Sequence, residues 1–112
     1  MSQRDVRGVL EEILDSLVKL DLLVYFHRNP DAADTAEGLA VWVGSDPEKV
    51  QQAAEDLVKV GILEKKGDIY HYTRDPQIVG AVERFVNERY MVREERMRLI
   101  AEILQKEGAS GG

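Results

Sequence analysis

The chain has 112 residues, 44% of them hydrophobic, which fits one compact domain. It contains no cysteine, which excludes a disulfide framework or a thiolate metal site and favours the reducing interior of a cell. The N-terminus mixes charges with its apolar residues, and no stretch approaches the roughly 18 apolar residues that a membrane-spanning helix needs. We therefore expect a soluble, cytoplasmic protein with no signal peptide and no membrane contact.

The net charge is -6, and its distribution along the chain matters more than its size. Residues 21–75 hold six basic and eleven acidic side chains, whereas residues 76–112 hold six of each. Non-specific binding to nucleic acid comes mainly from lysine and arginine side chains that neutralise phosphates. The acidic middle of the chain therefore weighs against strong non-specific binding to DNA.

The N-terminal residues 1–28 are predicted to form one long helix or two helices end to end. Their apolar side chains recur at steps of four and three residues, the spacing of one helical face. They are Val6, Leu10, Ile13, Leu17, Leu20 and Val24. Ser16 or Asp21 can cap a second helix, so continuity is left open. The helical region is expected to end with Asn29 in a left-handed conformation, because Pro30 cannot continue a helix.

A polar link at residues 31–34 precedes a short predicted helix. Thr35 is suited to cap the start of this helix, and Gly44 is suited to end it. Its buried side chains are expected to be Leu39, Ala40 and Val43.

A second helix is predicted directly after this turn. Either Ser45 or Asp46 caps it, and Pro47 suits its first position because proline has no N–H that needs a partner there. The helix is expected to end at Gly61. Its buried stripe is predicted to be Val50, Ala54, Leu57 and Gly61.

The stretch ILEKKGDIYHYT predicts a tight hairpin with a two-residue loop, at either 66–67 or 67–68. Strand side chains alternate between the two faces, so either loop places Leu63, Tyr70 and Tyr72 on the core side. His71 is then expected to face solvent opposite Glu64.

Asp75 and Pro76 mark the start of a last helix, which is predicted to run through about Lys106 and to leave a flexible tail at 107–112. Its apolar residues form two blocks, Ile78, Val82, Phe85 and Val86, then Met97, Ile100, Ile103 and Leu104. A small core cannot cover both blocks, so we expect a homodimer formed by the first and last helices. The interface is expected to include Val6, Leu10, Ile13, Leu17, Phe85, Tyr90, Met97, Ile100 and Leu104. The alternative is that the second block folds back onto the N-terminal helix of its own chain.

The predicted order of helix, short helix, turn, helix and hairpin resembles the winged helix-turn-helix family over residues 20–74. The resemblance rests on Leu39, Ala40, the turn at Gly44, Val50, Leu57 and the junction VGILEKKG. The long flanking helices are similar in layout to MarR-like and PadR-like transcription regulators. The resemblance implies a mostly α fold with a small β-hairpin, in which N-terminal helices at 1–28 and a dimerisation helix at 75–106 flank the winged core.

In that family the helix after the turn enters the major groove of DNA and the hairpin lies along the backbone. The resemblance therefore implies a transcription regulator that binds double-stranded DNA as a homodimer. The DNA contacts that it implies are Ser45, Lys49, Gln51, Gln52, Lys59, Lys65 and Lys66. Either glutamine can bond an adenine at both N6 and N7. Arg89, Arg93 and Arg96 from the last helix are expected to add positive charge to this surface.

The same helix also carries acidic residues, which favour a second class of function. These are Asp46, Glu48, Glu55 and Asp56, against which the helix sets only Lys49 and Lys59. Carboxylates beside phosphates lower affinity for DNA. The alternative is an acidic protein-interaction module that does not bind DNA. Its contact surface is expected to use Trp42, Tyr90, Met91 and Met97, since aromatic and methionine side chains are enriched in interfaces.

Nothing in the sequence indicates catalysis. His27 lies at a predicted helix end and His71 in a predicted strand, and the chain has no glycine-rich phosphate loop and no His-x-x-x-His or paired-carboxylate motif. We expect no enzyme activity, no metal site and no cofactor.

Overall fold

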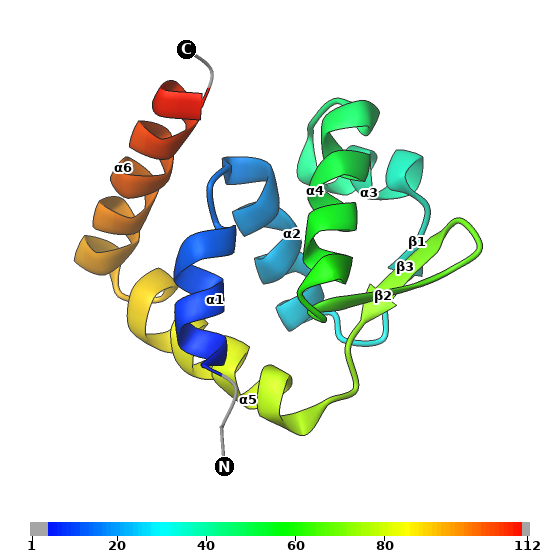
Figure 1. Ribbon diagram of the computed structural model, residues 1–112, viewed down its shortest axis with the longest axis horizontal. Coiled ribbons are helices and arrows are strands. Elements are labelled where there is room, and N and C mark those ends of the chain that lie inside the picture. Colours follow the sequence, from blue (N-terminus) through cyan, green and yellow to red (C-terminus); the bar gives the residue numbers. More distant parts are fainter. Residues whose placement is uncertain (1–4, 111–112) are drawn as a thin grey trace.

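The computed structural model describes residues 5–110 and is mostly helical, with a small antiparallel sheet (Figure 1). The helices are α1 (Val6–Ile13), α2 (Leu17–Arg28), α3 (Ala36–Val43), α4 (Pro47–Lys59), α5 (Pro76–Phe85), the π-helix η1 (Val86–Tyr90) and α6 (Arg93–Ser110). The strands are β1 (Ala33–Asp34), β2 (Leu63–Lys66) and β3 (Ile69–Tyr72), in the order β1-β3-β2. None of the helices described is both long enough and apolar enough to cross a membrane.

The core forms around α2, which lies at the centre of the molecule (Figure 1). Leu22, Leu23 and Phe26 are fully buried, and α2 contacts α3, α4, α5, α6 and β3. A helix that is apolar on most of its sides is stable only when other elements surround it. The remaining exposed side of α2 is therefore narrow.

The N-terminal region is two helices, because the chain leaves the helical conformation between Ile13 and Leu17. The N–H of Lys19 donates to Ser16 Oγ at 3.2 Å, which starts α2 at one of the two predicted caps. The prediction of a left-handed Asn29 is wrong, since its φ is -130°. The ring of Pro30 restricts the residue before it to extended conformations, and this restriction outweighs the preference of asparagine for a left-handed cap.

The predicted caps of α3 and α4 are confirmed. The N–H of Gly38 donates to Thr35 Oγ1 at 3.2 Å, and Gly44 ends α3 with a φ of 67°. Asp46, not Ser45, caps α4 by accepting from the N–H of Glu48 at 3.1 Å. The helix ends at Lys59, two residues before the predicted end.

The hairpin closes with the two-residue loop at 67–68, because Lys66 pairs with Ile69. Leu63, Tyr70 and Tyr72 are buried, as predicted. The strand β1 lies in the segment predicted to be a polar link, where Ala33–Asp34 pairs with β3. A two-residue strand contains no periodicity that a sequence can reveal.

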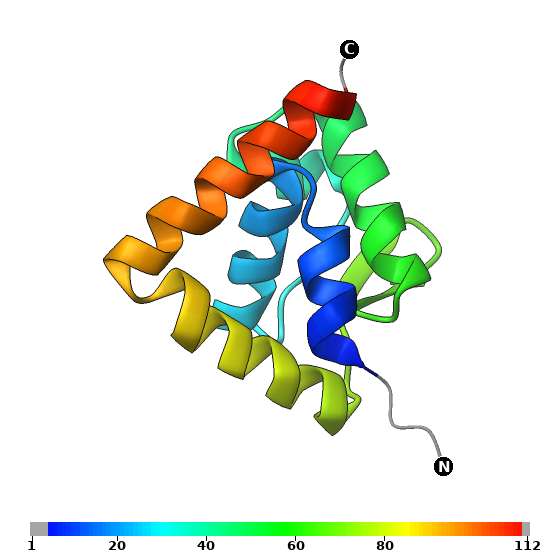
Figure 2. The same cartoon turned by 60° about the vertical axis from the view of Figure 1, so that its left-hand side comes forward.

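The prediction of one continuous helix from residue 75 to 106 is wrong. The chain forms α5 and η1, reverses direction near Met91, and returns as α6 across α2 (Figure 2). Leu99 and Ile103 of α6 are buried in the core of their own chain. The predicted alternative, with the second apolar block folded back onto its own N-terminal helices, is what the structure has. The predicted tail is helical as far as Ser110, and residues 1–4 and 111–112 lie outside the described residues.

Candidate interaction surfaces

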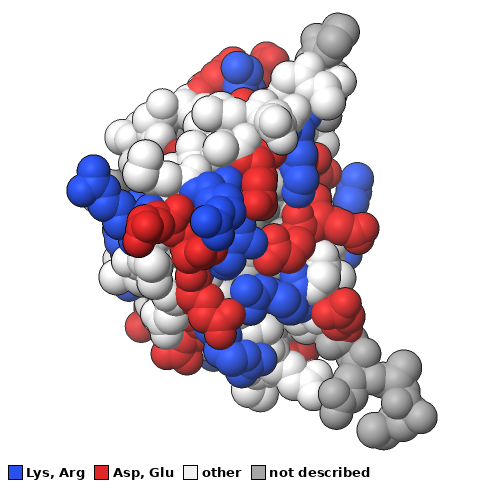
Figure 3. Space-filling model, turned by 90° about the vertical axis from the view of Figure 1, so that its left-hand side faces the viewer, with Lys and Arg blue, Asp and Glu red and all other residues white. Residues whose placement is uncertain are grey.

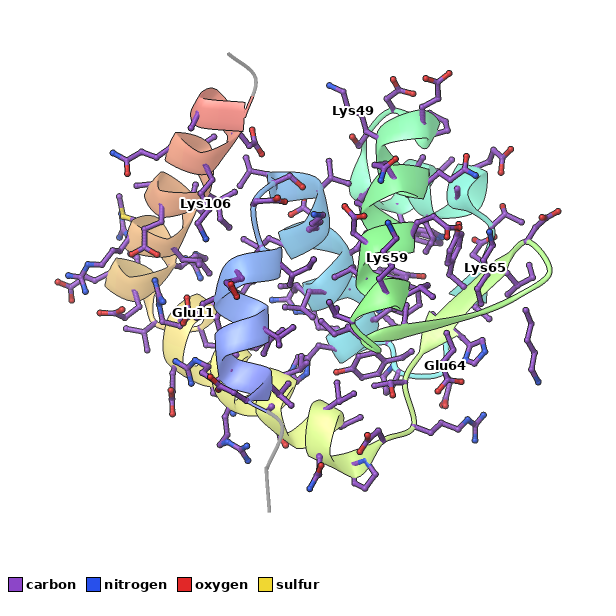
Figure 4. All side chains as sticks on the ribbon, viewed as in Figure 1. Glu11, Lys49, Lys59, Glu64, Lys65 and Lys106 are labelled. Carbon is purple, nitrogen blue, oxygen red and sulfur yellow. The ribbon has the colours of Figure 1, made fainter. Side chains whose placement is uncertain are left out.

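The first candidate surface is formed by the outward side of α4, the turn before it and the β2–β3 hairpin; we call it the α4–hairpin surface. All seven predicted DNA contacts lie here, and all except the half-buried Ser45 are exposed. Figure 4 shows Lys49 and Lys59 at the two ends of α4 and Lys65 on the hairpin beside it. Lys66 is the exception to this arrangement, because it points to the other side of the hairpin and lines a hollow there with Glu64 and His71.

Lys65 does not present a free charge on this face. Its Nζ lies 2.6 Å from Oε2 of Glu55, and the hydroxyl of Tyr70 donates to the same oxygen. The bond from Lys65, followed by the bond from Tyr70, holds the pKa of Glu55 below its ordinary value. The bond to Glu55 in turn raises the pKa of Lys65. The lysine and the carboxylate therefore compensate each other within the surface.

A second lysine, Lys19 of α2, is committed to Asp56 of α4. Its side chain is only 8% exposed, and its Nζ lies 2.9 Å from Asp56 and 2.7 Å from Asp15. Burial alone would lower the pKa of Lys19, but the bonds to Asp15 and Asp56 raise it overall. The bond from Lys19 lowers the pKa of Asp56. Lys59, which is 75% exposed, lies 3.9 Å from the same carboxylate.

The α4–hairpin surface consequently remains acidic. Its basic side chains are Lys49, Lys59, Lys65 and Lys66, and its acidic side chains are Asp46, Glu48, Glu55, Asp56, Glu64 and Asp68. Within residues 5–110, Lys49 and Lys66 are the lysines of this surface without an ion pair. Glu48 and Asp68 are exposed and also lack a basic partner there.

Two of the three arginines expected to add positive charge to this surface, Arg89 and Arg96, are bound elsewhere. Arg89 is bound to Glu11 and Glu102, and Arg96 donates to the backbone oxygen of Tyr90 at 3.0 Å. These contacts connect η1 with α1 and α6. Figure 3 shows the side where α6 lies, on which basic and acidic side chains alternate and no basic patch stands alone.

The second candidate is a hollow of about 320 Å³ between α2, α3 and η1, which we call the Tyr25–Trp42 hollow. The rings of Tyr25 and Trp42 stack with centroids 6.3 Å apart, and Tyr90, Asp21 and Arg28 also line the hollow. Trp42 is 69% exposed, and its neighbour Val41 is 81% exposed. Single exposed apolar residues are common, but adjacent ones beside stacked aromatic rings indicate a contact surface.

The structure changes the predicted dimer interface. Leu10 and Phe85 have no exposed surface in the single chain, so they offer nothing to a partner. The cause is the packing of α1 against α5 within the same chain, since these two helices carry Leu10 and Phe85. The half-buried members of the predicted interface are Val6, Ile13, Leu17, Tyr90 and Ile100, and the exposed members are Met97 and Leu104.

The sequence pattern indicated only part of the Tyr25–Trp42 hollow. Trp42 and Tyr90 were named as contact residues, but Asp21, Tyr25 and Arg28 were not. A signal was present, since these three α2 residues are four and three positions apart and share one helical face. Their spacing defines a common helical face. Only the packing of α3 and η1 against α2 shows which residues lie beside that face.

Among the residues that the structure describes, no group of three histidine, cysteine or acidic side chains is placed to hold a metal ion. His71 lies opposite Glu64 in the hairpin, as predicted, with Nδ1 3.8 Å from Oε1. No protein-family model matches the chain, and no curated protein or solved structure matches it either.

Proposed function

We propose that this chain is a winged-helix protein whose α4–hairpin surface binds a basic segment of a protein partner. The proposal of the fold is supported by the order of elements, in which α3, a tight turn and α4 lead directly into the β2–β3 hairpin. The observation that carries the function is the pairing of Lys65 with Glu55 at 2.6 Å. Because of this pairing, Lys65 of the hairpin is not free to contact a DNA phosphate.

The ion pair opposes DNA binding in two ways. To reach a phosphate, Lys65 has to leave Glu55, and the uncompensated carboxylate then lies on the surface that faces the DNA. Two like charges about 4 Å apart repel by roughly 1 kcal/mol in water and by more where water is excluded. Asp56 differs from Glu55, because its main partner Lys19 is buried behind α4 and stays paired with it.

The same surface suits a partner of opposite charge. Glu48 and Asp68 are exposed and lack a basic partner among residues 5–110, and they lie on α4 and at the hairpin tip. Lysine or arginine side chains of a bound protein can pair with these groups without breaking the pairs inside the surface. Complementary charge of this kind speeds association and selects among partners more than it adds affinity.

DNA binding by a dimeric transcription regulator is the second candidate. The observation in its favour is that Lys49, Lys66 and Gln51 are exposed, with no side-chain hydrogen bond or ion pair among the described residues. Gln52 donates to Asp56 at 3.3 Å and is less free to read a base. Lys49 and Lys66 provide few phosphate contacts per chain, which implies weak binding with a shallow salt dependence.

One pair of substitutions distinguishes the two candidate functions, because the two functions predict opposite changes in binding affinity for each substitution. Glu48→Lys adds positive charge to the surface and Lys49→Glu adds negative charge. We expect a labelled lysine- and arginine-rich peptide to bind the wild type, to bind Lys49→Glu more tightly, and to bind Glu48→Lys several-fold more weakly. Fluorescence anisotropy at about 50 and 200 mM salt measures these affinities.

A labelled duplex of mixed sequence is the second probe in the same experiment. Micromolar DNA binding that Lys49→Glu abolishes and Glu48→Lys strengthens would overturn the proposal in favour of a DNA-binding regulator. Glu94→Lys is the matched control for Glu48→Lys. It makes the same change of charge at an exposed position on α6, away from α4.

A further inference from the structure

We propose that a second copy of this chain docks on the Tyr25–Trp42 hollow around a two-fold axis beside Tyr25. In this arrangement Asp21 of each copy pairs with Arg28 of the other. The proposal uses a different face from the α4–hairpin surface, so it does not depend on the proposed partner of that surface.

The geometry of α2 makes its exposed side self-complementary. Asp21 and Arg28 are seven residues apart, which is about two helical turns and roughly 10.5 Å along the axis. In a two-fold dimer, a contact from one residue to another is repeated in the opposite direction. Two antiparallel α2 helices that cross beside Tyr25 therefore bring an acid opposite a base at both ends of the contact.

Within the part of the chain that the structure describes, both charges lack an ion-pair partner. Among residues 5–110, neither Asp21 nor Arg28 has an oppositely charged group within ion-pair distance. The guanidinium of Arg28 lies 5.8 Å from the centre of the Tyr90 ring, which orients it at the hollow without neutralising it. Burial raises the pKa of Asp21, and no nearby cation opposes this effect. A partner that supplies an arginine completes the site.

The apolar part of the same face supplies the burial that a dimer needs. Trp42 and Val43 of α3 line the hollow beside the charged side of α2, and Tyr25 supports Trp42 by stacking. Tryptophan, tyrosine and arginine are the side chains most enriched at the energetic centres of interfaces. The hollow therefore combines apolar anchors with charges that match those of a second copy.

The exposed Met97 and Leu104 of α6 form a competing apolar strip. Arg93 and Glu94 lie four and three residues before Met97 on the same side of α6, and within residues 5–110 neither has an ion pair. The strip therefore also has unpaired charges nearby, but α6 carries no aromatic side chain to act as an anchor, and for this reason we assign the second copy to the hollow.

Charge reversal tests the assignment. Asp21→Arg places two arginines opposite each other at both ends of the contact, and Arg28→Asp places two aspartates there. We expect sedimentation velocity to show a dimer for the wild type and a dimerisation weakened by more than about tenfold for each single variant. A mixture of the two variants restores both acid–base pairs, so we expect it to form a heterodimer.

The mixture makes the result independent of any loss of folding. Circular dichroism shows whether each variant keeps the helical content of the wild type, and Asp68→Arg at the hairpin tip controls for the change in net charge. A wild type that is monomeric at all concentrations would overturn the proposal. So would a dimer that both single variants leave intact and that Met97→Glu dissociates.

Discussion

Arg89 of η1 holds Glu11 of α1 through two hydrogen bonds, each 3.1 Å long, from Nη1 to the two carboxylate oxygens. Its Nη2 donates to Glu102 of α6 at 3.1 Å. Burial alone would lower the pKa of Arg89, but the bonds to Glu102 and Glu11 raise it overall. One half-buried side chain therefore connects three elements and holds α6 against its own chain.

Replacing Arg89 is expected to loosen α6. Arg89→Met removes hydrogen bonds to charged partners and leaves Glu11 and Glu102 close together, which lowers the free energy of unfolding by roughly 1–3 kcal/mol. Chemical denaturation measures the loss, and amide hydrogen exchange is expected to increase most in α6. Arg98→Met is the control, because Arg98 is exposed and pairs only with Glu95. Equal losses in the two variants would contradict the role of Arg89.

Lys19 and Lys59 both approach Asp56, and they are expected to differ in their contribution to stability. Lys19→Met breaks a shielded pair between α2 and α4 and costs roughly 1–3 kcal/mol. Lys59→Met removes an exposed contact of 3.9 Å and changes stability by less than about 0.5 kcal/mol. Urea denaturation at neutral pH compares the two variants. A larger loss from Lys59→Met would show that the buried pair does not connect the helices.

The pair of Lys19 and Asp56 also predicts the response to acid. The folded pKa of Asp56 is lower than its ordinary value of 3.8, mainly because of Lys19. The stabilisation is therefore fully present above the ordinary pKa and is lost as the pH falls through the lower, folded value. We expect Lys19→Met to reduce this acid dependence, measured as the free energy of unfolding between neutral and acidic pH. An unchanged dependence would contradict the prediction.

Tyr72 is expected to reduce stability at alkaline pH. Burial, followed by the charge of Glu83, raises the pKa of Tyr72 from 10.0 to about 12. Tyr72 ionises at a lower pH in the unfolded chain than in the folded chain. The free energy of unfolding therefore falls between about pH 10 and about pH 12, by roughly 2–3 kcal/mol. Tyr72→Phe removes this loss. At neutral pH the substitution keeps or raises stability, because the buried Tyr72 hydroxyl has no hydrogen-bond partner among the described residues.

Denaturation of the wild type and Tyr72→Phe from neutral to alkaline pH measures this difference. Tyr25→Phe is the control, since its hydroxyl belongs to a half-buried side chain at the hollow. A loss of more than about 1 kcal/mol at neutral pH in Tyr72→Phe would show that the hydroxyl has a stabilising partner.

Gly44 is expected to be needed for its backbone conformation and not for space. Its φ is 67°, and an added Cβ would meet nothing within 4 Å. Gly44→Ala therefore costs about 1–2 kcal/mol through backbone strain alone, and Gly44→Asn costs less, because asparagine tolerates this conformation. Gly108→Ala in α6 is expected to stabilise by about 0.5–1 kcal/mol. Thermal denaturation ranks the three variants, and an alanine at position 44 without cost would contradict the prediction.

The local features of the fold were predictable because each depends on neighbouring residues. Thr35, Asp46 and Asp75 cap helices through bonds to N–H groups two or three positions along the chain. The alternation of side chains in β2 and β3 placed Tyr70 and Tyr72 in the core. Interactions of such short range leave a pattern in the sequence itself.

The path of the C-terminal half was not predictable from such patterns. The apolar residues of α5 and α6 fit one long dimerising helix as well as two helices packed on their own chain. The choice depends on contacts such as that between Arg89 and Glu11, which join residues far apart in the sequence. The two-residue strand β1 likewise exists only because β3 lies beside it.

For the candidate surfaces, too, some properties follow from the sequence and others only from the fold. Residue types and helical spacing identified the exposed residues of α4 and show why Gln51, Lys49 and Lys59 lie outside the core. The charge that these residues present was set by partners from other elements, Lys65 for Glu55 and Lys19 for Asp56. A sequence specifies which groups carry charge, but their availability to a partner depends on distances of about 3 Å between distant segments, and the folded packing alone sets those distances.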